Sequence, residues 1–239
     1  MNILLIAGHG NGDPGAVKLG YEEAAEARKL LPIIQKLLPI IQKHLSPYAN
    51  VTIADTSIGW YRHICTNGNS FNFRPYDYVL EIHFNAAAND AKGNGKTTGS
   101  EIYVTMSEKV VAVEENILKG MEILGFKNRG VKAKNYGLIS YIKKQGVSAA
   151  LMEICFLDDR DDMNLYEAKK NEIGLAIAEG IARGYKLTKE DSLSESCNIL
   201  YDAGIINSPN YWAKGKGYSD ANTVLLIQKF ANYVKKKEG

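Results

Sequence analysis

The sequence has few cysteines, little net charge and no long apolar run, and each of these absences excludes a class of protein. Its three cysteines, Cys65, Cys155 and Cys197, are an odd and scattered set, which fits free thiols in a reducing compartment better than a disulfide framework. The 29 basic and 27 acidic side chains leave a formal charge of +2, so nucleic acid and anionic membranes are not expected as partners. No apolar run reaches the roughly 18 residues that a membrane-spanning helix needs, so no membrane insertion is expected.

The N-terminal segment also lacks the marks of a secretion signal. Residues 2–7 are apolar, but no basic region precedes them and they run directly into His9. This pattern predicts a first buried strand rather than a signal peptide. The chain is therefore expected to be synthesised in the cytoplasm without a signal peptide, wherever it later acts.

What the sequence does contain is an alternation of strand-like and helix-like segments, with 45% hydrophobic residues to build a core. Strands are predicted at residues 2–7, 51–54, 78–83, 101–105 and 148–156, and helices from 21 to about 45, over 107–124 and within 161–185. This alternation predicts an α/β fold, a mostly parallel twisted sheet with helices on both faces. Because residues 187–192 are polar, we expect a catalytic domain over residues 1–187 and a small helical C-terminal module over 188–239.

One internal repeat lies in the first predicted helix, where residues 29–35 are copied without change as residues 36–42. Seven residues are almost two helical turns, so the copy rotates the apolar face by only about 20°. The repeat is either a tandem duplication without a role of its own or an extended helix that contacts a second subunit.

Chemistry-bearing residues accompany three of the predicted strands. His9 lies between two glycines, which let the backbone turn sharply after the first strand. Glu81 and His83 share one face of a middle strand, and burying them is costly unless they are partnered. Glu153 interrupts an apolar strand, where it would protonate or need a cation. Because reactive crevices of open α/β sheets lie beyond the carboxyl ends of the strands, these residues predict one shared site.

Each of these residues also has a plainer structural interpretation. His9 could be a polar loop residue, His83 a core histidine satisfied by a hydrogen bond, and Glu153 a member of a buried salt bridge. Two imidazoles and a carboxylate from distant segments would instead make a three-ligand zinc site with one open position, the catalytic arrangement. Glu153 beside such a metal would serve as a general base.

These motifs, in this order, resemble the zinc-dependent N-acetylmuramoyl-L-alanine amidases of phage endolysins and bacterial autolysins, over residues 1 to about 185. The family pattern begins with a Gly-His-Gly stretch that ends in Asp-Pro-Gly-Ala, here residues 8–16, followed by a glutamate that opens the first helix. It continues with His-x-Asn-Ala at residues 83–86 and a late glutamate in an apolar strand, Glu153. Residues 128–132 also look like this family's. Together these motifs are specific.

The resemblance implies that Zn²⁺ is bound by His9, His83 and the helix glutamate, with Glu153 as the catalytic acid/base. We choose Glu23 as the helix ligand because an alanine follows it and a basic residue stands five positions on, as in phage relatives. Adjacent helical residues point about 100° apart, so only one glutamate can face the metal. Glu22 is the alternative ligand.

The resemblance also implies the function, a peptidoglycan hydrolase that cleaves the amide bond between N-acetylmuramic acid and L-alanine with zinc-activated water. The expected setting is a phage or prophage endolysin that acts on the bacterial cell wall after release. Asn85 and Arg129 are expected to orient the substrate. The alternatives are a zinc peptidase that acts on stem peptides and a non-catalytic wall-binding protein with a degenerate site.

The C-terminal module is less informative. It contains Trp212 and four tyrosines, and aromatic side chains serve equally in a core, in stacking on sugars and at interfaces. The module is therefore expected to bind the cell wall or to mediate self-association, and the duplicated helix is a second route to a homo-oligomer.

Overall fold

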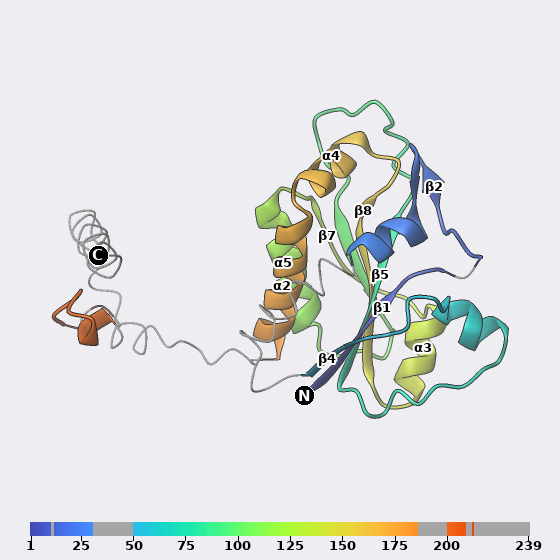
Figure 1. The fold of residues 1–239 in the computed structure, drawn as a ribbon, viewed down its shortest axis with the longest axis horizontal. Helices are drawn as coiled ribbons and strands as arrows, with labels where there is room; N and C mark the ends of the chain where they lie inside the picture. Colours follow the sequence, from blue (N-terminus) through green and yellow to red (C-terminus); the bar gives the residue numbers. More distant parts are fainter. Residues whose placement is uncertain (11, 31–49, 186–199, 209–211, 213–239) are drawn as a thin grey trace. The chain divides into compact units, whose positions relative to one another are not determined.

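A computed structural model of the protein describes residues 1–10, 12–30, 50–185, 200–208 and 212 (Figure 1). The chain divides into two compact units, Met1–Leu187 and Thr188–Gly239. The predicted fold class is confirmed, since the first unit contains a sheet of mostly parallel strands with helices around it. Most of the duplicated segment, residues 31–42, lies outside the described residues.

The sheet brings strands together that are far apart in the sequence. Its six strands lie in the order β4 (Asn50–Ile53), β1 (Asn2–Ala7), β5 (Tyr78–Asn85), β8 (Ser148–Phe156), β6 (Ser100–Val104) and β7 (Asn128–Ala133). The four strands β4, β1, β5 and β8 are parallel, whereas β6 runs antiparallel to β8 and β7 is parallel to β6. The carboxyl ends of β1, β5 and β8 therefore meet at one edge, where a site is expected.

Helices cover both faces of this sheet (Figure 1). One face packs on α2 (Ala112–Leu124), α4 (Arg160–Ala168) and α5 (Lys170–Gly184), and the other packs on α3 (Gly137–Lys144) and η1 (Arg62–Thr66). Alternate residues of β1 serve the two cores, since Ile3 and Leu5 join the first and Leu4 and Ile6 the second. A strand buried on both faces is apolar along its whole length, which explains the unbroken run in β1.

Several predicted boundaries were wrong because tertiary contacts override local pattern. Residues 21–22 form β3 (Tyr21–Glu22), a short hairpin with β2 (Val17–Lys18), and the helix begins at residue 23. The helix predicted from residue 107 begins at Ala112, because the Glu108 carboxylate is bound by Lys143 and Ser148. The segment 161–185 contains the two helices α4 and α5, and the sequence analysis missed η1, β7 and α3.

Aspartates that follow β8 hold the loop between β5 and β6. The Asp158 carboxylate accepts the backbone N–H groups of Ala87, Ala88 and Asn89, and Asp161 accepts those of Asn94, Gly95 and Lys96. Asp159 accepts from Thr98 and from the backbone at the start of α4, and Asp162 accepts from Gly99. Asp90, Asp159 and Asp161 lie close enough together for a cation, but backbone donors already occupy most of their oxygens. We therefore assign this acidic group to loop anchoring.

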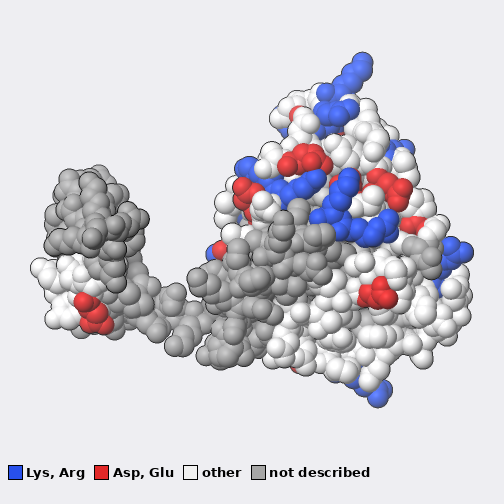
Figure 2. Space-filling view, in the orientation of Figure 1, with Lys and Arg blue, Asp and Glu red and all other residues white. Residues whose placement is uncertain are grey.

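Other surface and core features agree with the composition. Among the described residues, none of the helices has the length and apolarity to span a bilayer. Cys65 and Cys155 are free thiols, and Cys197 lies outside the described residues. On the face shown in Figure 2, basic side chains gather in the upper part of the described surface with acidic side chains among them.

The described part of the second unit contains a small core of its own. Ile205 and Ile206 are buried, and Leu200, Ala203 and Trp212 pack against them. Tyr201 is about half exposed. Trp212 thus contributes to packing within the module.

Gly8 is the residue of the fold on which the site depends most closely. It follows β1, and a β-carbon placed on it would lie 2.4–2.6 Å from three ring atoms of His83. Real side chains do not approach this closely, so only glycine allows β1 to run beneath the imidazole. The backbone N–H of Gly8 also donates to the carbonyl of Ile82, which fixes this approach.

We predict that Gly8→Ala displaces the His83 ring and lowers the free energy of unfolding by about 1–3 kcal/mol, the usual cost of overpacking. Urea unfolding and the imidazole resonances of His83 measure the two effects. Gly20→Ala is the matched control, because Gly20 has φ of 84° with no atom near its β-carbon position, so strain is its only cost. Unchanged stability and resonances in Gly8→Ala would contradict the close approach.

Candidate metal and catalytic site

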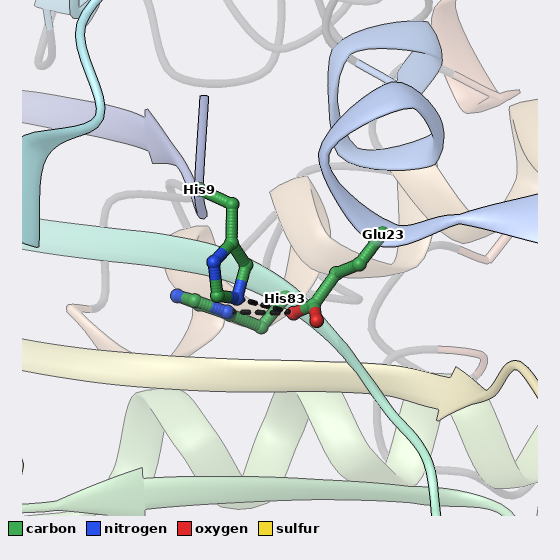
Figure 3. A group of neighbouring side chains, drawn as sticks. All are labelled: His9, Glu23 and His83. Carbon is green, nitrogen blue, oxygen red and sulfur yellow. Dashed lines mark hydrogen bonds and ion pairs between the residues drawn. The ribbon is translucent and has the colours of Figure 1, made fainter. Parts of the chain in front are cut away.

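Three side chains from distant segments converge at the carboxyl edge of the sheet (Figure 3). His9 follows β1, Glu23 opens the first helix, and His83 lies near the end of β5. One oxygen of Glu23, Oε1, lies 3.2 Å from Nε2 of His9 and 2.8 Å from Nδ1 of His83. The two imidazole rings are nearly perpendicular, with centroids 4.9 Å apart. A nitrogen from each ring and a carboxylate oxygen thus face one point.

The backbone around these residues aims them inward. His9 has φ of 60°, a left-handed conformation that is uncommon for a residue with a β-carbon and is typical of functional sites. Its Nδ1 contacts the Asp13 carboxylate at 2.9 Å, which leaves Nε2 to face Glu23. The Glu23 carboxylate also accepts the backbone N–H groups of Ala16 and Phe84, at 2.9 and 3.2 Å. The three side chains are therefore held in place by contacts within the chain itself.

The electrostatics of the three residues are strongly coupled. Burial opposes ionisation of Glu23, but the hydrogen bonds from His83 and His9 hold the pKa of that carboxyl well below its usual range. Burial alone would lower the pKa of His83, yet the carboxylates of Glu81 and Glu23 raise it well above its usual value. Glu23 is consequently an anion at neutral pH, the state in which a carboxylate binds a metal.

Glu22, the alternative helix residue, lies elsewhere. Its carboxylate is partly exposed and lies 3.7 Å from the guanidinium of Arg28. Residue 22 belongs to the β2–β3 hairpin, so it is not a helical neighbour of Glu23 but the last residue of an extended segment. The structure thus brings Glu23, and not Glu22, together with the two histidines.

Glu153 lies beside His83 on the neighbouring strand. The two residues are paired in the parallel register of β5 and β8, so their side chains stand on the same face of two strands that are about 4.8 Å apart. Oε2 of Glu153 is buried and has no hydrogen-bond partner among the described residues. Burial raises the pKa of Glu153 to about 7, with the charges of Glu23, Glu101 and Glu81 adding to it and His83 opposing it. A carboxyl with this pKa exchanges protons readily at neutral pH.

Asn85 and Arg129 are both bound to Glu101, a buried residue that the sequence analysis did not single out. Nδ2 of Asn85 donates to Glu101 at 2.9 Å, and Nε of Arg129 donates to it at 2.5 Å. Lys132 also contacts this carboxylate. Glu101 pairs with Glu153 across β6 and β8, so this network borders the site. The structure gives Asn85 a place in the wall of the pocket that contains Glu153, whereas Arg129 is not among the residues that line this pocket.

His9, Glu23, His83 and Glu153 line a pocket of about 330 Å³, together with Asn85. Besides the residues already named, its wall contains Tyr61, Tyr136, Leu138 and Leu151. Tyr61 is about half exposed and packs over Gly137, where a β-carbon would lie 2.6 Å from its ring. Sequence reasoning missed both tyrosines because they precede η1 and α3, two elements that it did not predict. In the sequence, only the Tyr136-Gly137 pair could have indicated an aromatic residue at the pocket.

The chain is similar to known proteins over most of the first unit. Residues 3–183 match the family model described as N-acetylmuramoyl-L-alanine amidase. Probable autolysin PH of Staphylococcus aureus is 28% identical over 176 residues, which cover 68% of this chain and 34% of that protein. An uncharacterised protein of Clostridium perfringens is 32% identical over 109 residues, or 44% of this chain and 31% of its own length. The chain thus spans about a third of the curated relatives that it matches.

Solved structures share the fold. The catalytic domain of CwlV, an N-acetylmuramoyl-L-alanine amidase from Bacillus (Paenibacillus) polymyxa var. colistinus, is 21% identical with a TM-score of 0.59, over 79% of this chain and all of that one. The catalytic domain of the CD27L endolysin targeting Clostridia difficile is 23% identical with a TM-score of 0.55, over 76% of this chain and 96% of that one. The extent of the family match decides the assignment, and the chain belongs to the N-acetylmuramoyl-L-alanine amidase family.

Proposed function

We propose that this chain hydrolyses the amide bond between N-acetylmuramic acid and L-alanine in peptidoglycan, with Zn²⁺ held by His9, Glu23 and His83 and with Glu153 as the acid/base. The observation that carries the proposal is the placement of Glu153. Its unpartnered Oε2 belongs to the same pocket as the three candidate ligands, on the strand beside His83. The family match and the relationship to an autolysin support the substrate class.

The donor set suits zinc. Two nitrogens and one carboxylate oxygen are ligands that zinc takes in catalytic sites, with one position left for substrate or water. Ligand atoms about 2.0–2.1 Å from a tetrahedral zinc ion lie about 3.3 Å from one another. The Glu23 oxygen lies 3.2 and 2.8 Å from the two ring nitrogens, and all three candidate ligand atoms lie within 4.8 Å of one another, which is compatible with a shared ion.

The charge of the pocket also favours a cation. Glu23, Glu81 and Glu153 line it beside two histidines, which gives a formal charge of −3 when the imidazoles are neutral and the carboxyls are ionised. Buried carboxylates at this density are costly unless positive charge accompanies them. A divalent ion would offset two of the three charges.

The residues of the site have separate roles in the proposed hydrolysis. Zinc bound by the three ligands would lower the pKa of a water molecule towards about 7 and polarise the scissile carbonyl. Glu153 accepts a proton from the attacking water and delivers it to the departing nitrogen of L-alanine. Tyr61 and Tyr136 provide walls for the substrate, while Asn85, with one amide N–H used on Glu101, keeps a second donor for it. Arg129 keeps donors beyond its bond to Glu101 for the same purpose.

We place the action of the protein on the bacterial cell wall, as a phage or prophage endolysin, in keeping with the autolysin and the endolysin among the similar proteins. The second unit is proposed to hold the enzyme at the wall or to join copies of the chain.

The metal assignment predicts about one zinc ion per chain. His9→Ala and His83→Ala are expected to lose both zinc and activity, because each removes one of three ligands. Glu23→Gln is expected to lose zinc in the same way, whereas Glu22→Gln keeps it, since the Glu22 carboxylate lies against Arg28. Metal analysis by mass spectrometry after dialysis measures this. The ligand set would be overturned if His83→Ala kept its full zinc content. It would also be overturned if Glu22→Gln lost zinc while Glu23→Gln kept it.

The acid/base assignment predicts that Glu153→Gln keeps zinc but loses activity by about 10²–10⁴-fold, the contribution of a general acid/base. The change keeps the size of the side chain and removes its ability to carry a proton. Release of soluble fragments from purified peptidoglycan measures activity, and Glu172→Gln, an exposed change on α5, is the control. Loss of the metal or of the fold in Glu153→Gln would mean that Glu153 is a structural ion-pair partner.

The division into two units predicts that a chain ending at Leu187 folds, binds zinc and cleaves soluble muropeptides at the rate of the whole chain. On intact cell walls it should be slower, because a tethered wall-binding module raises the local substrate concentration. Both rates can be compared directly with those of the whole chain. If the truncated and whole chains cleave intact walls at equal rates, and the isolated module dimerises instead of sedimenting with walls, the module would serve self-association. Loss of activity on soluble substrate would place the boundary elsewhere.

A further inference from the structure

Glu81 is a buried carboxylate that neither the ligand set nor the acid/base role uses. It is only 3% exposed and precedes His83 by two residues on β5, so both side chains lie on the same face of the strand. Its Oε1 lies 3.0 Å from Nε2 of His83. The other ring nitrogen, Nδ1, lies 2.8 Å from Glu23. The His83 imidazole is therefore placed between two carboxylates, one at each nitrogen.

The surroundings of His83 pack closely around its ring. The ring lies against the backbone at Gly8, where even a β-carbon would be within 2.4–2.6 Å. Nε2 is buried, and its 3.0 Å contact with Oε1 of Glu81 is a charge contact without the alignment of a hydrogen bond, so the described part of the chain gives this nitrogen a carboxylate neighbour and no hydrogen-bond partner. A neutral imidazole carries its proton on one nitrogen only, so a proton on Nε2 leaves the Nδ1 lone pair for a metal.

Glu81 differs from Glu153 in what its oxygens can do. The Glu153 carboxylate has a buried oxygen without a partner, which is the state expected of a proton carrier. The Glu81 carboxylate contacts the distal nitrogen of a proposed ligand, which is the state expected of a group that orients it. Carboxylates in this position fix the tautomer of a metal-binding histidine and raise its basicity.

We propose that Glu81 is a positioning residue, which accepts the Nε2 proton of His83 and thereby presents Nδ1 to the metal. This inference rests on the proposed zinc site and extends it. It also explains why an acidic residue occupies an otherwise apolar, fully buried stretch of β5, since burying a carboxylate there is costly without such a partner.

The test compares Glu81→Met, which removes both the charge and the acceptor, with Glu81→Gln, which keeps an acceptor oxygen. Zinc affinity, measured by competition with a chromophoric chelator, should fall about 10–100-fold in Glu81→Met, the usual cost of losing such a partner. Glu81→Gln should lie between this variant and the unchanged protein. Nitrogen-15 NMR of the His83 ring in metal-free protein, at a pH high enough for the ring to be neutral, should show the proton on Nε2 in the unchanged protein and a mixture of tautomers in Glu81→Met.

Glu114→Met is the matched control. Glu114 is equally buried, at 2% exposure, and its carboxylate accepts a hydrogen bond from Tyr78 at 2.8 Å, away from the pocket. Glu114→Met should lower stability and leave zinc affinity and the His83 tautomer unchanged. This separates a general cost of losing a buried carboxylate from the specific role of Glu81.

The inference would be overturned if both Glu81 variants kept the zinc affinity and the His83 tautomer of the unchanged protein. It would also be overturned if Glu114→Met lost as much zinc affinity as Glu81→Met. If Glu81→Met does not fold, Glu81→Gln and the ring tautomer of the unchanged protein decide, and an unprotonated Nε2 would also overturn it. Failure of the proposed function would appear differently, as an unchanged protein that has no affinity for zinc.

Discussion

The contact of the Glu23 carboxylate with two imidazoles joins the three segments from which the site is built. One oxygen of Glu23 lies within 3.2 Å of both His9 and His83. That geometry requires the helix after the hairpin to begin at residue 23, and it requires glycine at residue 8 so that the His83 ring can lie against the first strand. The hairpin, the strand order and the close approach at Gly8 therefore act together to bring His9, Glu23 and His83 into contact.

The register of the sheet places two further carboxylates in a row with His83. His83, Glu153 and Glu101 stand in a row across β5, β8 and β6. Burial and neighbouring carboxylates raise the pKa of Glu153, while Arg129 and Lys132 hold that of Glu101 low against burial. The pKa values of these two carboxyls on adjacent strands thus shift in opposite directions, because Lys132 and Arg129 form hydrogen bonds to Glu101 whereas Oε2 of Glu153 has no hydrogen-bond partner among the described residues. Glu101 is held in ion pairs, and the unpartnered oxygen of Glu153 is consistent with its proposed role in proton transfer.

The sequence predicted the parts of the fold and site that depend on local pattern. Apolar strands buried on both faces, such as β1 and β8, were recognisable, and so were the histidines and Glu153 that interrupt or follow them. The start of α2 was mispredicted because Glu108 is held by Lys143 and Ser148, which are 35 and 40 residues away. β7 was missed because most of residues 128–133 are polar, so no apolar pattern indicates a strand there. Its backbone is held in the extended form by its pairing with β6. The sequence analysis did not find Glu101 or the pocket tyrosines, since only the folded chain pairs Glu101 with Glu153 and brings the tyrosines into the same pocket.

The central claim is that the site cleaves the bond between the lactyl group of muramic acid and L-alanine, and that it needs a metal to do so. Mass spectrometry of peptidoglycan digested by the protein, with and without a chelator, tests both parts together. The expected products carry new amino termini on L-alanine and free muramic lactyl groups, and they disappear with chelator and return with added zinc. Cleavage within the stem peptide, or the same products at an undiminished rate in chelator, would contradict the account.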